Sequence, residues 1–109
     1  MSYNERVMAA TAAAVVYPHI TKHQKIMGGR ACIDGTRIRV MDIANLHETG
    51  YTPERIREEY PRLNLIQIYA ALVYYHDHKA EIEACFAESE RWATENERER
   101  AEYLRKRSR

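Results

Sequence analysis

The sequence predicts a mainly helical, single-domain protein, with a small β-hairpin ahead of a three-helix core and a long, charged helix after it. Three observations lead to this fold. An Asp-Gly pair at residues 34–35 separates two short β-prone segments. Residues that favour helix N-termini recur at Asp42, Thr52 and Asn64, and the composition turns abruptly to Glu and Arg after Ala80. The 109 residues amount to about one domain and suffice for a modest core without disulfides or metals.

Composition and charge exclude several classes of protein. The net charge is only +1, so any contact with nucleic acid needs a local basic face. Cys32 and Cys85 lie far apart in no metal-binding or redox pattern, which predicts two reduced thiols in a cytoplasmic protein. The apolar run Leu65–Tyr75 falls short of the roughly 18 residues that a membrane span requires, so no membrane contact is expected.

The first predicted elements are a helix and a hairpin. A helix is predicted over Glu5–Val15, so that residues 1–18 form an N-terminal helical extension. Residues 19–25 are expected to be irregular, and the Asp-Gly pair at residues 34–35 predicts a type I′ hairpin turn. In the strand predicted after that turn, apolar residues on a buried face alternate with basic residues on an exposed face. Its apolar positions are Ile38 and Val40, and its basic positions are Arg37 and Arg39.

Two short helices are predicted after the hairpin. Asp42 is expected to cap the first helix, which runs over Ile43–Thr49 and stops at a glycine. Thr52 caps the second helix, with Pro53 in the first helical position, and this helix ends near Glu59.

The third helix carries the most apolar surface of the chain. Asn64 caps it, and it runs over Leu65–His78 with apolar residues nearly all round. One side of this helix can face the two short helices, whereas the other side needs a returning helix or a partner subunit. A homodimer is the assembly expected from this second apolar side.

The three helices have the proportions of a helix-turn-helix, in which the start of the last helix faces the major groove of DNA. Polar side chains there read bases, while nearby arginines hold phosphates, and such proteins are usually two-fold symmetric. The expected base-reading residues are Arg62, Asn64 and Gln67, and the expected phosphate contacts are Arg37, Arg39, Arg55 and Arg57. The spacing fits equally well a unit that only packs, with Asn64 as a helix cap and Gln67 as a surface residue.

No set of residues in the sequence indicates catalysis or a metal site. His19 and His23 lie one helical turn apart, and His76 and His78 follow later, yet no acidic or thiol ligand stands at a matching spacing. The sequence also lacks a nucleophile motif and a phosphate-binding glycine loop. It therefore predicts a binding protein, not an enzyme, with no cofactor and no metal.

Residues 80–109 differ in composition from the rest of the chain. A thin apolar stripe of Ile82, Cys85, Phe86 and Trp92 runs through a series of Glu and Arg. The last twelve residues hold six basic and two acidic side chains. We expect a long helix that is firm near Phe86 and frayed towards its end unless a partner binds it.

Four short motifs follow one another along the chain, namely G-G at residues 28–29, G-T-R-I at residues 35–38, Y-P-R-L at residues 60–63 and A-A-L at residues 70–72. In this order they resemble the signature of a bacterial family known as domain of unknown function 433. The resemblance covers residues 19–79. Ala31 stands where the family has a proline, and Asn64 stands where it has Thr or Ser, a change that keeps the helix cap.

The resemblance implies a homeodomain-like helical fold and an antitoxin-like role in a type II toxin–antitoxin pair. The chain is then expected to neutralise a PIN-like nuclease toxin and, as a further expectation, to bind its own operator DNA. The alternative function, from a different class, is a protein-interaction or dimerisation module with no affinity for DNA.

The charged segment outside the resemblance suits a partner-binding role, because a marginal segment with aromatic anchors can fold on its target. The expected contacts are Phe86, Trp92, Arg98, Arg100, Tyr103, Leu104, Arg105 and Arg107. The arginines suit a carboxylate-lined metal site, in which bidentate pairing displaces the ion. The competing interpretation is that residues 80–93 only cover the third helix and that the rest is disordered.

Overall fold

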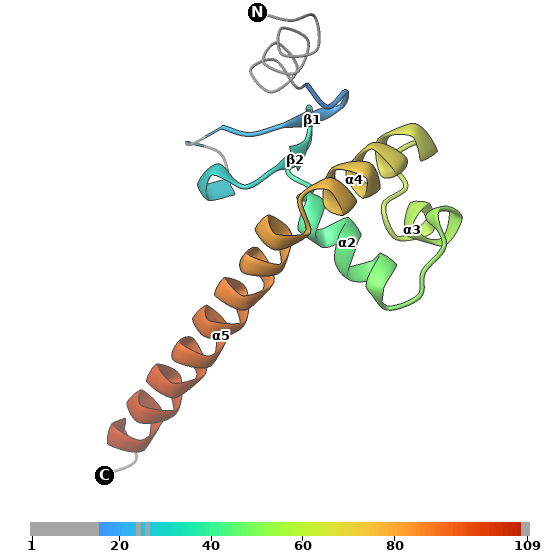
Figure 1. The fold of residues 1–109 in the computed structure, drawn as a ribbon. Helices are drawn as coiled ribbons and strands as arrows, with labels where there is room; N and C mark the ends of the chain where they lie inside the picture. The colour runs from blue at the N-terminus through green and yellow to red at the C-terminus, as the bar shows by residue number, and fades with distance from the viewer. Residues whose placement is uncertain (1–15, 24, 26, 108–109) are drawn as a thin grey trace, which may run out of the picture.

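A computed structural model describes residues 16–23, 25 and 27–107 of the protein (Figure 1). The helix predicted over Glu5–Val15 lies outside these residues. In chain order the elements are β1 (Ile20–Thr21), a 3-10 turn (Met27–Gly29), β2 (Cys32–Ile33), α2 (Val40–Glu48), α3 (Pro53–Glu59), α4 (Leu65–Asp77) and α5 (Lys79–Arg107). The prediction of a mainly helical fold, with a three-helix core, a small hairpin and a long last helix, is confirmed for the described residues.

The small sheet differs from the predicted hairpin in its partner strands. β1 pairs antiparallel with β2, although residues 19–25 are expected from the sequence to be irregular. Residues 38–40, the predicted second strand, join β2 only through an isolated antiparallel bridge between Cys32 and Arg39, with backbone hydrogen bonds on either side of it. A strand of two residues has no periodicity that a sequence pattern can reveal, which is why β1 was not predicted.

The hairpin loop, residues 34–37, turns at Gly35. The φ angle of Gly35 is +75°, whereas Asp34 is not among the residues with positive φ. This is the pattern of a type II turn, so the predicted type I′ turn is wrong, since that turn needs positive φ at both central positions. Thr36 donates to the carbonyl oxygen of Ile33 through its backbone nitrogen at 3.1 Å and through its hydroxyl at 2.8 Å, and these bonds hold the loop.

The starts of the two short helices are set by local hydrogen bonds. Thr52 caps α3 as predicted, with its hydroxyl oxygen accepting a backbone hydrogen bond of 3.2 Å. The predicted cap of α2 is wrong, because the helix begins at Val40, with Arg39 in the N-cap position and Asp42 inside the first turn. The Asp42 carboxylate accepts from the backbone nitrogen of Arg39 at 2.9 Å, so it still satisfies a donor at the helix start.

α4 is the central element of the core and packs against α2, α3 and α5. Side chains from all of these elements and from β2 meet around it in one apolar cluster. The largest fully buried side chains are Ile33, Val40, Ile43, Ile56, Ile68 and Ile82. Ile82 is the point at which α5 enters this core, so only the first turns of that helix contribute to it.

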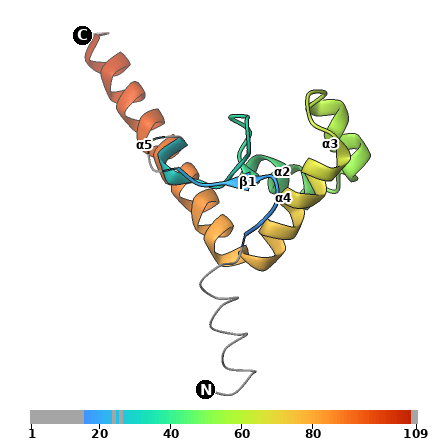
Figure 2. The same ribbon diagram turned by 90° about the horizontal axis from the view of Figure 1, so that it is seen from above.

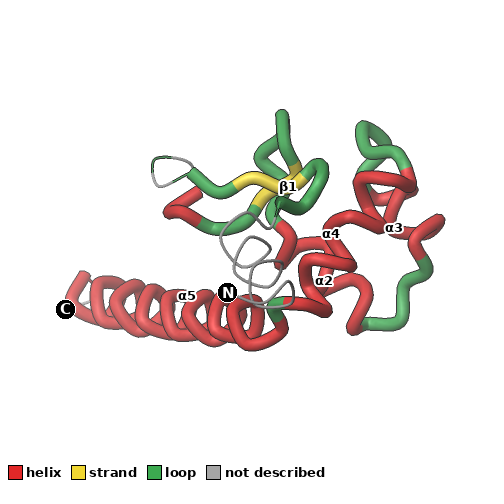
Figure 3. Tube along the Cα trace, turned by 45° about the horizontal axis from the view of Figure 1, so that its top comes forward, coloured by secondary structure: helices red, strands yellow, loops and turns green. Residues whose placement is uncertain are grey.

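α5 leaves the core and projects into solvent as one continuous helix (Figures 1 and 3). Its 29 residues span about 43 Å, and every residue from 90 to 107 is exposed. The radius of gyration is 18.5 Å, against roughly 13 Å for a compact domain of this length. The fraying expected towards the end of this helix is not present up to Arg107. Among the described helices, none is both long enough and apolar enough to cross a membrane.

A cluster of polar and aromatic contacts fixes the junction between α4 and α5. Tyr74 donates from its hydroxyl to Glu81 at 2.8 Å, and Lys22 forms an ion pair with the same carboxylate at 2.6 Å. Burial opposes ionisation of Glu81, yet the hydrogen bonds from Lys22 and Tyr74 outweigh it and hold the pKa of Glu81 below its usual value. The Tyr74 ring also stacks on His78. These contacts set the direction in which α5 leaves the core.

Candidate binding surfaces

α3, the turn over residues 60–64 and α4 form the predicted helix-turn-helix arrangement, and the start of α4 is held by a reciprocal pair of hydrogen bonds. Asn64 accepts from the backbone nitrogen of Gln67 at 2.9 Å, and Gln67 accepts from the backbone nitrogen of Asn64 at 2.9 Å. This is a capping box, which satisfies two otherwise unpaired donors at the helix start. The side-chain oxygens expected to read bases are therefore already used by the helix, and reading an adenine edge with both residues would break the box.

Replacing Asn64 by Ala tests this structural assignment. We expect Asn64→Ala to lower the free energy of unfolding by about 1 kcal/mol, because the N-cap acceptor is lost, and to leave any DNA affinity unchanged. Urea denaturation followed by circular dichroism measures the first effect. Asn45→Ala, an exposed asparagine whose side chain makes no hydrogen bond among the described residues, is the matched control. Unchanged stability with a large loss of DNA binding would assign Asn64 to base reading instead.

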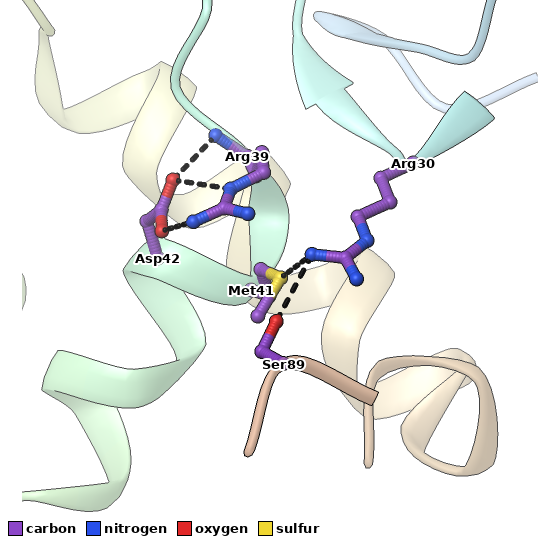
Figure 4. Close-up of polar contacts among 5 residues, drawn as sticks. All are labelled: Arg30, Arg39, Met41, Asp42 and Ser89. Atoms are coloured by element: carbon purple, nitrogen blue, oxygen red, sulfur yellow. Dashed lines mark hydrogen bonds and ion pairs between the residues drawn. The ribbon is translucent and has the colours of Figure 1, made fainter. Parts of the chain in front are cut away.

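Three of the predicted phosphate contacts differ in how far their charge is already engaged within the chain. Arg39 forms a two-pronged ion pair with Asp42, with Nη2–Oδ1 at 2.8 Å and Nε–Oδ2 at 3.1 Å (Figure 4). The hydrogen bond to Asp42 raises the pKa of Arg39, and the carboxylate offsets its charge. Arg55 lies over the ring of Tyr51, 4.3 Å from the ring centroid, and Arg57 is exposed on α3. Arg39 and Arg55 are therefore engaged with neighbours in the chain, whereas Arg57 is exposed.

Arg37 and Arg62, in contrast, line one groove. The groove has a volume of about 1050 Å³ and lies between the hairpin loop and the turn before α4. We call it the basic groove, and its lining residues are Thr21, His23, Lys25, Arg30, Cys32, Asp34, Gly35, Thr36, Arg37, Ile38 and Arg62. His23, Lys25 and Arg30 were not predicted to belong to a binding surface, because no local sequence pattern connects them to Arg62.

Arg30 links this groove to α5. Its Nη1 donates to the hydroxyl of Ser89 at 3.1 Å and approaches the sulfur of Met41 at 3.3 Å (Figure 4). Its other terminal nitrogen lies 3.5 Å from the carboxylate of Glu88. Arg30 thus ties the segment before β2 to the last part of α5 that contacts the core.

The exposed side of α4 is apolar rather than polar. Ile66, Tyr69 and Val73 are 66%, 49% and 55% exposed, and their spacing places them on one face, which we call the α4 apolar face. A helix that reads the major groove presents hydrogen-bonding side chains there. The second apolar side predicted for this helix is therefore present, and within the described residues α5 does not cover it.

The residues predicted to contact a partner fall on different faces of α5. At about 100° per residue, Trp92, Arg100, Tyr103 and Arg107 lie within roughly 80° of one another, and we call them the tail face. Leu104, which is 49% exposed, lies at the edge of this face. Arg98 and Arg105 lie on the opposite side of the helix.

The tail face continues the side of α5 that packs on the core. Ile82, Cys85 and Ser89 occupy the same angular sector of the helix as the tail face, and Phe86 lies at its edge, in line with Leu104. Phe86 is half-buried against the core, so it contributes to folding before it can contribute to a partner contact. Trp92 and Tyr103, at 67% and 62% exposed, extend this stripe beyond the core.

Comparisons with known proteins agree with the fold. DUF433, a family of proteins of unknown function, matches residues 20–75, just over half of the chain. Among solved structures, the crystal structure of a DUF433 member from Anabaena variabilis is similar, with a TM-score of 0.60 and 23% sequence identity. The match covers 80% of this chain and 86% of that chain, and at this identity it demonstrates a shared fold. None of the curated proteins matches.

Proposed function

Since the chain belongs to the DUF433 family of proteins of unknown function, we propose that it is an antitoxin-like binding protein of a type II toxin–antitoxin pair. In this proposal it neutralises a PIN-like nuclease toxin through α5 and binds its own operator DNA through a second surface. In this role the chain binds other molecules and catalyses no reaction. The observation that carries it is the exposed tail of α5, residues 90–107, which projects from a folded core.

Residues 90–107 of α5 should gain helical stability when a partner binds them. An isolated helix of this length is marginal in water, and most helical stability in proteins comes from packing an amphipathic face. Trp92 and Tyr103 are aromatic side chains of the kind that dominate binding energy, and both are more than 60% exposed. A partner that covers the tail face would extend the apolar stripe that begins at Ile82 and bury both rings.

The charge on the tail face suits a nuclease as that partner. Arg100 and Arg107 flank Tyr103 on the same side of the helix. A guanidinium pairs with a carboxylate through two parallel hydrogen bonds, which a metal-binding carboxylate of a nuclease site would accept once its ion has left. Neutralisation would then follow from blocking the nuclease site and displacing its metal.

A second candidate function is an interaction or dimerisation module without DNA binding. The α4 apolar face favours it, because Ile66, Tyr69 and Val73 occupy positions where a DNA reader presents polar groups. The salt dependence of binding to upstream DNA separates the two functions. A DNA-binding protein loses affinity steeply as salt rises, in proportion to the phosphates it neutralises, and a module of this second kind shows no such binding.

Co-expression with the product of the neighbouring gene tests the proposed function directly. We expect the neighbouring product to arrest growth when expressed alone, and this chain to restore growth and co-purify with it as a stable complex. A variant of the neighbour that lacks its metal-binding carboxylates is the control for toxicity. A harmless neighbour that does not co-purify would contradict the antitoxin role.

A further inference from the structure

We infer that the basic groove binds the phosphate backbone of duplex DNA. This inference rests on the operator-binding half of the proposed function and deepens it by naming the surface. That surface is the hairpin loop and the turn before α4, rather than the outward face of α4. It is separate from the tail face, so DNA and a nuclease partner would occupy different parts of the molecule.

Positive charge is concentrated in the groove. Four basic side chains, Lys25, Arg30, Arg37 and Arg62, line it, against one carboxylate, Asp34, among the described lining residues. The whole chain carries a net charge of only +1, so this groove is much more basic than the average surface. A cleft lined by one sign of charge concentrates counter-ions of the other sign, and duplex DNA carries one negative charge per roughly 1.7 Å of its helix axis.

Arg37 and Arg62 have no partner among the residues that the structure describes, which leaves their charges available to a ligand. Arg37 and Arg62 make no hydrogen bond or ion pair with any residue that the structure describes. In contrast, Arg30 is held by Ser89 and Glu88, and Arg39, outside the groove, is paired with Asp42. Unpaired guanidinium groups retain their full capacity to donate to phosphate oxygens, and no internal ion pair must be broken on binding.

Local hydrogen bonds hold the backbone on which both arginines are carried. Arg37 lies in the hairpin loop between Thr36 and Ile38, and the Thr36 hydroxyl accepts from the backbone nitrogen of Ile38 at 3.0 Å. Arg62 precedes Leu63, which is 2% exposed and donates from its backbone to Tyr60 at 2.9 Å. Figures 2 and 3 show the hairpin loop and the turn before α4 rising on the same side of the molecule. Because the backbone of both loops is already anchored, little further backbone ordering is needed when the arginines bind.

The lining of the groove favours a duplex over a single strand. Proteins that bind single-stranded nucleic acid stack bases on aromatic side chains, and the described lining contains no Phe, Tyr or Trp. The Thr21 hydroxyl and the basic side chains suit phosphate and sugar oxygens instead. Since the capping box uses Asn64 and Gln67, the contacts that remain at this end of α4 are to the backbone.

The test is the binding of a fluorescently labelled duplex of about 30 base pairs, three helical turns, taken from upstream of the gene. Fluorescence anisotropy is measured across a salt series for the full chain and for the double variant Arg37→Gln/Arg62→Gln. We expect affinity to fall about tenfold and the slope of log affinity against log salt to become shallower by about two. Arg98→Gln/Arg105→Gln, which removes the same charge from the far side of α5, is expected to bind within about twofold of the unmodified chain.

Each outcome other than the expected one overturns a different part of the proposal. Wild-type affinity and slope in the groove variant, or an equal loss in the α5 variant, would overturn the groove as the DNA site while leaving DNA binding itself in place. Tighter binding of the matching single strand than of the duplex would overturn the choice of duplex. No binding of the duplex by the full chain at about 50 mM salt would overturn both the groove and the operator half of the function. Neutralisation of the nuclease, measured in parallel, tests the antitoxin half separately and should be unaffected by Arg37→Gln/Arg62→Gln.

Discussion

Ending the chain after Ala93 is expected to abolish neutralisation of the nuclease partner while leaving a folded core. The deletion removes residues 94–109 and with them Arg100, Tyr103 and Arg107 of the tail face. Loss of even one interface hot spot costs about 2 kcal/mol or more, so removal of three such side chains should weaken binding by roughly ten-thousandfold. Growth rescue on co-expression and affinity for the purified partner are the measurements.

The core should survive this truncation for a structural reason. Every residue from 90 to 107 is exposed, whereas Ile82 and Phe86, which attach α5 to the core, are retained. A thermal unfolding transition close to that of the full chain would confirm that the loss of neutralisation is not a loss of folding. A truncated chain that still rescues growth would remove α5 as the nuclease-binding element.

Paired substitutions on the two sides of α5 refine the same prediction. Arg100→Gln/Arg107→Gln changes the tail face, and Arg98→Gln/Arg105→Gln makes the same change in charge on the opposite side. The first pair should weaken the partner complex about a hundredfold, and the second pair by no more than about threefold. Equal effects of the two pairs would mean that net charge, rather than one face of the helix, directs binding.

The helix starts show what the sequence can and cannot predict about this fold. Thr52 and Asn64 act through a backbone donor three residues away, so their role is visible in the local sequence and is confirmed. Asp42 belongs to the same class of residue, but α2 begins at Val40 and places it inside the first turn. A capping residue and an acidic residue at the third helical position have similar sequence signatures, and only the fold separates them.

For the binding surfaces, too, the sequence predicts some features, whereas others depend on the fold. Arg37 and Arg62 are predicted as DNA contacts from two separate motifs, and the structure brings them to one groove together with Lys25. No pattern along the chain connects residues from three distant segments, because their proximity is set by how the sheet packs beside α4. The tail differs, because helical periodicity alone separates Arg100 from Arg98 once the helix is known to be continuous.

The α4 apolar face leads to the second large prediction, which is a homodimer in solution. Ile66, Tyr69 and Val73 form a contiguous apolar strip on a helix whose other side is buried in the core. Exposed apolar patches on a protein surface mark interaction sites, and a second copy of the chain always offers the same strip, as a two-fold interface requires. Light scattering at micromolar concentration should therefore give twice the mass of the chain, and a monomeric mass there would remove the prediction.

Charged substitutions locate the dimer interface on this face. Ile66→Glu/Val73→Glu should convert the dimer to a monomer, because two carboxylates would be buried without partners, at a cost of several kcal/mol. Ala84→Glu/Ala87→Glu places the same two charges on exposed positions of α5 that face away from the core, and should leave the dimer intact. If the first variant stays dimeric, the interface lies elsewhere, and the α4 apolar face remains available to the nuclease partner. In that case the partner would contact α4 as well as α5, and Ile66→Glu/Val73→Glu would weaken neutralisation instead of assembly.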